Sequence, residues 1–281
     1  KKKKNEVIFK KIYAKYKNRF SELKIDIESL KQNDKEVIIN NQYKFDYVID
    51  CRGFPKDYSN YTMVDLPINH CLVHAVDEPG TWKFTYHTAH KNGWMFGIPL
   101  QKRQGWGYLY NDTITSKEDA LKNFREIRNK DINLDNIREY MFKPFKANKY
   151  VNGRIMVNGN SALFYEPIEA ISGGFYDTLN IFYYEYIFHK TFNEEDININ
   201  VNYIADKYVN FISYLYRGGS TYDTDFWRHA VKICNNNLKN KKWFETIESI
   251  KQRKEDITRF PLSCEAWQIL DKNLYDGKTF N

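Results

Sequence analysis

The residue types best suited to chemistry lie in one turn, at positions 158–175. Two carboxylates, Glu166 and Glu169, stand on either side of Pro167, and glycines lie near both ends of the turn. A glycine-bearing turn between a strand and a helix lets the backbone approach a ligand closely. The N–H groups at the helix start then favour an anion or a phosphate-bearing cofactor. The alternative interpretation is a tight connection with solvated acids, because glycine-rich turns are common.

A second distinctive stretch is aromatic and covers positions 93–110. It reads Gly-Trp-Met-Phe-Gly-Ile-Pro-Leu over 93–100 and Gly-Trp-Gly-Tyr-Leu-Tyr over 105–110, with Arg103 between the two runs. Short aromatic and β-branched runs continue over 62–110, which predicts an antiparallel or mixed sheet. The histidines of this region do not have the spacing of a metal site on one helix, and we interpret them as polar strand or loop positions.

A weaker third feature is a buried strand that ends in Asp50-Cys51-Arg52-Gly53. Gly53 would allow the following loop to pass close to a cofactor. A buried strand that simply ends in a glycine turn explains the same residues.

Helices and further strands must position these stretches. The apolar periodicity predicts helices over 5–20, 135–142, 177–192, 201–216, 225–236, 242–253 and 263–274. A further helix is predicted to begin at Ser116, with a capping interaction between Ser116 and Asp119. Strands are predicted over 23–29, 37–39, 43–45 and 154–157, with a hairpin turn at Asn40-Asn41. The aromatic side chains after position 177 favour a helix-packed core, with an aromatic substrate box as the alternative.

Composition narrows the class of protein. The 281 residues are 42% hydrophobic and 17% aromatic, enough for one large domain or two closely packed ones. The formal net charge of +7 is concentrated near the N-terminus, at Lys1–Lys4 and Lys10-Lys11, and no nucleic-acid-binding motif accompanies it, so we predict no nucleic-acid partner. Lys, Asn, Ile and Tyr are abundant, which is typical of an AT-rich viral or bacterial genome.

The four cysteines are widely spaced, at Cys51, Cys71, Cys234 and Cys264. The absence of a CxxC or Cys/His cluster predicts free thiols and no metal site. No apolar run approaches the length of a membrane span and no signal peptide precedes the fold, so we predict a cytoplasmic protein without a membrane partner.

The two main stretches together resemble the flavin-dependent halogenases, the family typified by tryptophan halogenase. Positions 159–173 closely follow the family's Gly-Asp-Ala-Ala-Gly-Phe-Leu-Glu-Pro-Leu-Glu-Ser-Thr-Gly. Positions 93–110 follow its Gly-Trp-x-Trp-x-Ile-Pro-Leu, with Arg and Gly-x-Gly-Tyr-x-Tyr downstream. Weaker similarity extends from about Phe45 to the C-terminus. Two ordered motifs at family-like separation are more specific than either alone.

The resemblance implies a mixed α/β fold with an FAD-binding Rossmann-like domain, an inserted, mostly antiparallel sheet and a C-terminal helical region. The Gly-x-Gly-x-x-Gly that should open such a domain is absent, so we expect the domain to be incomplete at its N-terminus. We divide the chain into flavin-binding parts at 1–60 and 143–180, a β-sheet substrate region at 61–142 and a helical region at 181–281.

The resemblance also implies a chemistry. In the family FADH2, O2 and a halide ion yield hypohalous acid, which passes through a tunnel to a separate substrate pocket. The family glutamate that polarises the oxidant and accepts the arene proton falls on Glu169. Trp94 and Phe96 fall on the two family tryptophans that keep substrate away from the flavin, with core packing as the alternative. Ile98 and Pro99 would line the tunnel beside them.

Cofactor and halide contacts follow from the same motifs. The implied flavin contacts are Gly53, Gly159, Asn160, Pro167, Ser172 and Gly173. Backbone N–H groups of Ile171, Ser172 and Gly173 would hold the halide. We expect Glu166 to serve the turn itself, by accepting backbone N–H bonds at the helix start.

Three residues depart from the family pattern. Asn160 replaces the Asp that binds the ribityl chain, and Leu163 replaces a glycine and could crowd the cofactor. Ala170-Ile171 replaces Ser-Thr, so the hydroxyl contribution to the halide site is lost. A site lined by Ile could suit a larger, softer halide, or none.

The leading hypothesis is a flavin-dependent halogenase that acts on an aromatic or electron-rich small molecule. A separate flavin reductase would supply FADH2, and a homo-oligomer is one possible assembly. The departures motivate a second hypothesis, a degenerate flavoprotein that serves as a binding or structural subunit. A third is an FAD monooxygenase that hydroxylates its substrate.

Overall fold

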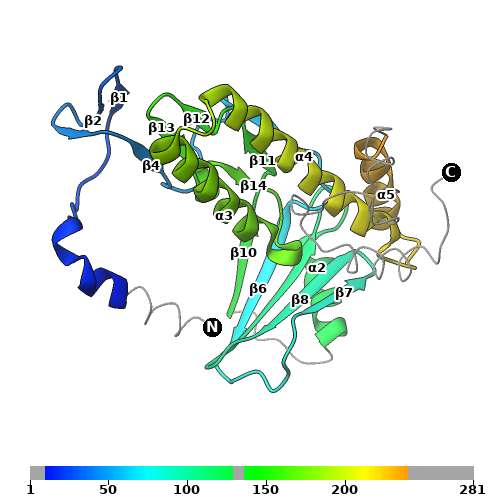
Figure 1. The fold of residues 1–281 in the computed structure, drawn as a ribbon. Coiled ribbons are helices and arrows are strands. Elements are labelled where there is room, and N and C mark those ends of the chain that lie inside the picture. The colour runs from blue at the N-terminus through cyan, green and yellow to red at the C-terminus, as the bar shows by residue number, and fades with distance from the viewer. Residues whose placement is uncertain (1–9, 129–135, 240–281) are drawn as a thin grey trace. The chain divides into compact units, whose positions relative to one another are not determined.

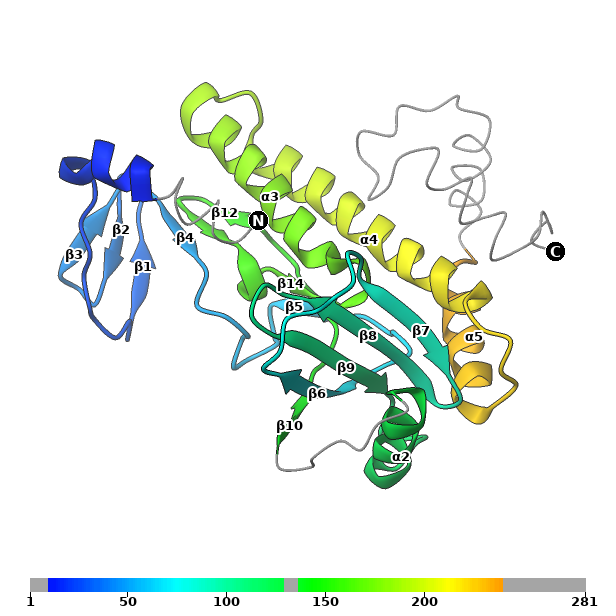
Figure 2. The ribbon, with the colours of Figure 1, turned by 90° about the horizontal axis from the view of Figure 1, so that it is seen from below.

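The computed structural model describes residues 10–128 and 136–239, in two compact units at Lys1–Val48 and Ile49–Asn281. In the first unit residues 10–15 are helical and lead into the 3-10 turn η1 (Lys17–Arg19). An antiparallel sheet with the strand order β1-β2-β3 follows. Its strands are β1 (Leu30–Gln32), β2 (Val37–Ile39) and β3 (Tyr43–Phe45). Figure 1 labels β1 and β2, and Figure 2 labels all three strands.

The hairpin between β2 and β3 confirms the predicted turn, whereas one predicted strand of this unit is wrong. Asn40 and Asn41 both have positive φ, 53° and 55°, as a tight hairpin requires. The strand predicted over 23–29 is absent, and β1 lies at 30–32 instead. Alternating apolar and polar residues form a strand only where a neighbour completes the hydrogen bonds, and Leu30 is the residue that pairs with Ile39.

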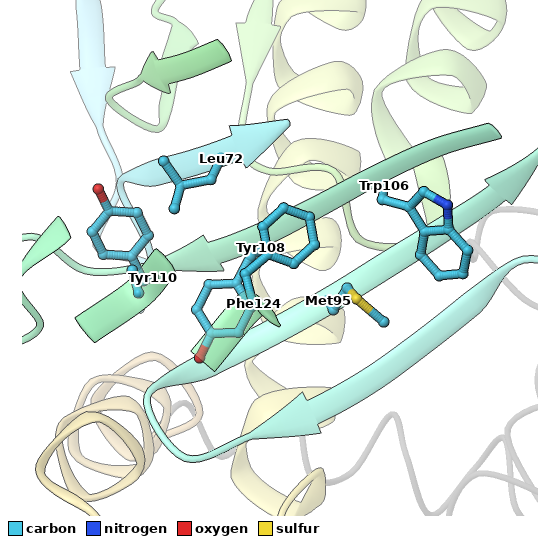
Figure 3. Close-up of a cluster of buried hydrophobic side chains, with 7 residues drawn as sticks. Leu72, Met95, Trp106, Tyr108, Tyr110 and Phe124 are labelled. Atoms are coloured by element: carbon cyan, nitrogen blue, oxygen red, sulfur yellow. The ribbon is translucent and has the colours of Figure 1, made fainter. Parts of the chain in front are cut away.

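A five-stranded antiparallel sheet is the centre of the second unit and confirms the β pattern predicted over 62–110. Its strand order is β10-β6-β9-β8-β7. Its strands are β6 (His70–Val76), β7 (Tyr86–His90), β8 (Gly93–Pro99), β9 (Gln104–Tyr110) and β10 (Ile137–Met141). Helix α2 (Lys117–Arg128) covers one face, where it packs with Leu72, Met95, Trp106, Tyr108, Tyr110, Ala120 and Phe124 (Figure 3). The expected cap of α2 is present, because Ser116 Oγ accepts from the Asp119 N–H at 3.1 Å.

The glycines of the aromatic stretch have a packing role in this sheet. Gly107 pairs with Phe96, and a Cβ on Gly107 would lie 2.3 Å from the Phe96 ring. On the other face, a Cβ on Gly97 would lie 2.3 Å from the ring of Trp106. Each glycine therefore leaves space for an aromatic ring of the neighbouring strand.

Strand β10 corrects the helix predicted over 135–142. Residues Ile137–Met141 pair with β6 in a five-residue antiparallel ladder, from Ile137↔His74 to Met141↔His70. The segment carries good helix formers, but the edge of β6 supplies hydrogen bonds and a packing surface that outweigh its local preference.

Two small sheets carry the turn at 158–175. One has the order β14-β11-β5 and the other the order β12-β13-β4. Their strands are β4 (Val48–Asp50), β5 (Tyr61–Met63), β11 (Phe145–Ala147), β12 (Val151–Asn152), β13 (Ile155–Val157) and β14 (Leu163–Phe164). The strand predicted over 154–157 is thus confirmed as β13.

Three helices follow the turn. Helix α3 (Ile171–Tyr184) begins six residues before the predicted position and continues as a π-helical turn, η5 (Glu185–His189). Helix α4 (Glu194–Gly218) also begins early, because Asn193 and Asp196 form a capping box. Helix α5 (Asp225–Asn237) confirms the prediction. Figure 2 shows α4 along the side of the five-stranded sheet opposite α2, where Trp94 of β8 contacts Tyr216. The helices predicted over 242–253 and 263–274 lie outside the described residues.

Within the described ranges, no helix is long and apolar enough to cross a membrane. Cys51, Cys71 and Cys234 are free thiols, and Cys264 lies outside those ranges. No group of three or more His, Cys, Asp or Glu side chains with metal-binding geometry occurs among residues 10–128 and 136–239.

Candidate functional site

The turn at 158–175 is built from four short elements in succession. After β13 come a 3-10 turn η3 (Gly159–Ser161), strand β14, a second 3-10 turn η4 (Ile168–Ala170) and helix α3. Asn158 caps η3 by accepting the Gly159 N–H at 2.7 Å, and its amide donates to Asn180 Oδ1 of α3 at 2.8 Å. The strand end and the helix are thereby held together by one buried side chain.

Gly53 is brought to this turn from 108 residues away. Its N–H donates to Ser161 Oγ at 3.1 Å, and the Ser161 hydroxyl donates back to the Gly53 carbonyl at 3.0 Å. Gly53 has φ +100° and Gly159 has φ +60°, both in the region that favours glycine. No atom lies within 4 Å of where a Cβ would stand on either glycine, so both backbones border open space.

The start of α3 holds the three residues predicted to bind halide. The Ile171 side chain is buried, and its N–H already donates to the Ile168 carbonyl. Ser172 and Gly173 belong to the first turn of α3, the part of a helix that an external anion can approach. Gly173 is exposed and borders open space. The halide role of these three residues stays a prediction.

Ala170 precedes this helix in a left-handed backbone conformation, with φ 51° and ψ 33°. That conformation is unfavourable for a residue with a Cβ, by about 1 kcal/mol or more. It redirects the chain from η4 into α3. The backbone of Glu169 lies in η4, directly before Ala170, and its side chain lies outside what the structure describes.

Asn160 is engaged within the protein. Its Oδ1 accepts from the Tyr176 hydroxyl at 2.7 Å, and the same hydroxyl lies 3.0 Å from the Leu163 carbonyl oxygen. Burial raises the pKa of Tyr176, so that it remains a neutral donor. The Leu163 side chain, which was expected to crowd a cofactor, is fully buried in the core.

The aromatic stretch forms β8 and places its residues on two faces. Trp94, Phe96 and Ile98 alternate along the strand and point to the side of α4, whereas Pro99 belongs to the opposite face. Trp94 is buried, Phe96 is half-buried and Ile98 is exposed. Of the four residues predicted to line the tunnel, the sheet brings three together. The fourth, Pro99, packs against Gly80.

A buried chain of hydrogen bonds joins β8 to the turn. The Trp94 Nε1–H donates to Tyr216 Oη at 2.6 Å, and the Tyr216 hydroxyl donates to Glu166 Oε2 at 2.7 Å. The residues are only 4%, 3% and 2% exposed. Burial raises the pKa of Glu166 to about 8, although the hydrogen bond from Tyr216 acts in the opposite direction. At neutral pH Glu166 is therefore a neutral carboxylic acid.

This arrangement corrects the role expected for Glu166. The sequence predicted that it accepts backbone N–H groups at the helix start, whereas in the structure it accepts from the side chain of Tyr216 on α4. Glu166 Oε1 is buried without a hydrogen-bond partner among the described residues. Sequence reasoning missed Tyr216, which it grouped with the other aromatics of a helical core. No local pattern marks it, since its partners are 50 and 122 residues away.

A pocket of about 890 Å³ lies elsewhere in the second unit. Its walls include Met63, Phe142, His229 and Ile233, and it shares no lining residue with the turn or with β8. The predicted site residues therefore do not line this pocket.

Comparison with known proteins identifies the family. The family model for tryptophan halogenase matches residues 14–263 of the chain. The chain belongs to the tryptophan halogenase family. Among its relatives in this family, tryptophan 7-halogenase RebH of Lentzea aerocolonigenes is 24% identical over 254 residues. This match covers 83% of the chain and 44% of RebH.

Solved structures agree on the tryptophan halogenase fold. BrvH, a flavin-dependent halogenase from Brevundimonas sp. BAL3, superposes with a TM-score of 0.70 at 19% identity. That match covers 88% of the chain and 54% of BrvH. The tryptophan 6-halogenase SttH from Streptomyces toxytricini has a TM-score of 0.67 at 21% identity, over 87% of the chain and 52% of SttH. The chain thus spans about half the length of these relatives.

Proposed function

We propose that the protein is a flavin-dependent halogenase that acts on an aromatic or electron-rich small molecule. The observation that carries the proposal is the match to the tryptophan halogenase family over residues 14–263. The geometry supports it, because Trp94 of the first motif and Glu166 of the second are joined through one side chain, Tyr216.

The residues around the turn fit a flavin. Gly53, Gly159 and Gly173 all border open space, so a flat cofactor could approach the backbone at each of them. The residues that would hold it are Gly53, Gly159, Asn160, Pro167, Ser172 and Gly173. Bound FADH2 would supply two of the four electrons that reduce O2, and the halide would supply the other two as it is oxidised to hypohalous acid. A separate flavin reductase would regenerate FADH2.

The chain's own residues would bind the halide and shape the site. The first-turn N–H groups of Ser172 and Gly173 favour an anion at the positive end of α3. The rings of Trp94 and Phe96 lie on one face of β8 and would separate the substrate from the flavin. We assign to Glu169 the carboxylate that accepts the arene proton as halogen replaces hydrogen.

The test uses the full-length protein with FAD, a flavin reductase, NADH and O2, together with bromide or iodide. Indoles and phenols serve as substrates, and products are read by mass spectrometry. We expect a product in which one hydrogen is replaced by halogen, and none when the halide is omitted. An oxygenated product without halogen would identify a monooxygenase instead. Absence of FAD binding by the full-length protein would identify a flavoprotein that has lost its cofactor.

A further inference from the structure

The chain of hydrogen bonds between Trp94 and Glu166 has a fixed direction. An indole N–H can only donate, so the Tyr216 oxygen accepts from Trp94, and the Tyr216 hydroxyl in turn donates to Glu166 Oε2. Glu166 Oε2 is therefore the acceptor, and a proton on this carboxyl resides on Oε1. Loss of the Tyr216 oxygen would leave the buried indole N–H without a partner.

Two buried groups that interact with Glu166 are neutral at neutral pH. Besides Tyr216, the buried Cys234 of α5 interacts with it, and burial raises the pKa of that thiol to about 12. Burial likewise holds the Tyr216 hydroxyl in its neutral form. The charge of Arg217 acts on Cys234 and lowers the pKa of that thiol, against the larger effect of burial. An ionised Glu166 would thus be a buried negative charge whose hydrogen-bond donor in the structure is Tyr216.

The backbone after Glu166 leads directly into the turn that carries Glu169. Pro167 follows Glu166 directly and fixes the backbone that enters η4, with φ −73°. The Ala170 N–H then donates to the Pro167 carbonyl at 3.1 Å. Two residues, Pro167 and Ile168, separate Glu166 from Glu169, so the hydrogen bonds to Glu166 restrain the backbone that carries Glu169.

We propose that Glu166 is a positioning residue that acts through Tyr216 on Trp94, holding the indole on β8 in register with the turn that carries Glu169. Its consequence for halogenation rests on the proposed function, whereas the hydrogen-bond chain itself does not. The proposal requires the environment of the Trp94 indole to follow the protonation of Glu166. A Trp94 that only fills the core would not respond to that carboxyl.

The test is a pH titration of the indole ¹H–¹⁵N signals of the full-length protein. The chain has six tryptophans, and Trp94→Phe assigns the relevant signal. We expect the Trp94 signal to shift with a midpoint near pH 8, the pKa of about 8 of Glu166. Glu166→Gln should abolish the titration, and Tyr216→Phe should displace the signal and uncouple it from pH.

A matched control is available next to Glu166. The buried Tyr165 hydroxyl donates to the Ala205 carbonyl at 3.2 Å, and Tyr165→Phe removes one buried hydrogen bond from the same turn. In this variant the Trp94 titration should persist unchanged. A Trp94 signal that does not titrate, or that still titrates in Glu166→Gln, would overturn the proposal.

The activity measurement is separate from the spectra. In the halogenation assay we expect kcat/KM of the wild type to change with pH, with a midpoint near pH 8. Glu166→Gln should remove this pH dependence. Tyr216→Phe should lower kcat/KM by about tenfold or more, because small displacements of a site wall are costly. Since the spectra need no turnover, they decide the positioning role even where the halogenation assay contradicts the proposed function. An unchanged pH profile in Glu166→Gln would count against the proposal.

Discussion

Replacing Glu166 by Gln is expected to change the pH dependence of folding stability, in a direction that can be worked out from its burial. The carboxyl has an ordinary pKa of 4.5, and burial raises it to about 8 in the folded protein. Below pH 4.5 the group is protonated in both the folded and the unfolded chain. Between these two values only the folded chain keeps the proton, so the free energy of unfolding falls as pH rises. Above about pH 8 both states are ionised and the loss is complete.

The magnitude follows from the difference between the two pKa values. Each pH unit corresponds to about 1.4 kcal/mol, so the wild type should lose about 5 kcal/mol of unfolding free energy through Glu166 between pH 4.5 and pH 8. Gln cannot ionise and lacks this dependence. At pH 4 the variant should be less stable than the wild type by about 1 to 3 kcal/mol. Its amide NH2 group would replace Oε1, which is buried without a hydrogen-bond partner, so its N–H donors would have no acceptor. At pH 8 it should be more stable by about 3 kcal/mol.

The assay is urea unfolding of wild type and Glu166→Gln, followed by tryptophan fluorescence at each pH from 4 to 9. The difference between the two unfolding free energies removes the contribution of all other titrating groups. Tyr165→Phe is the control, since burial holds the pKa of Tyr165 far above this range and its effect should not vary with pH. A difference between wild type and Glu166→Gln that stays constant with pH, or that moves in favour of the wild type as pH rises, would refute the reasoning.

Three further predictions concern the site and the scaffold. Glu169→Gln should lower the halogenation rate about a hundredfold or more, while FAD affinity, measured by flavin fluorescence, stays near wild type. Gly107→Ala should lower the unfolding free energy by about 1 to 3 kcal/mol, because its Cβ would lie 2.3 Å from the Phe96 ring. Gly105→Ala on the same strand meets no atom within 4 Å and should be close to neutral in the same urea assay. Asn193→Ala should remove the capping box of α4 and lower stability by about 1 kcal/mol, seen as a lower Tm.

Local patterns in the sequence determined several elements by themselves. The Asn40-Asn41 turn, the Ser116 cap and the strand at 37–39 depend on residues within a few positions of one another. The helix at 225–236 follows in the same way from apolar spacing along one segment. Membership of the tryptophan halogenase family was also readable, because the motifs that carry it are contiguous.

The errors occurred where contacts between distant segments decided the outcome. The segment at 137–141 is a strand because β6 lies beside it. Residues 23–29 are not a strand, and the Asn40 side chain, not a neighbouring strand, bonds the backbone of Asp26, Glu28 and Ser29. Local propensity contains no information about either neighbour.

The environment of Glu166 was decided by tertiary structure alone. Its sequence neighbours, Tyr165 and Pro167, suggest an exposed turn with solvated acids. The fold instead encloses it beside Tyr216 and Trp94. Tyr216 lies on helix α4, 50 residues after Glu166, and Trp94 lies on strand β8, 122 residues before Tyr216. The pKa of a carboxyl depends on the water that the fold removes and on the donors that it supplies. Both are set by segments that meet only in the folded chain.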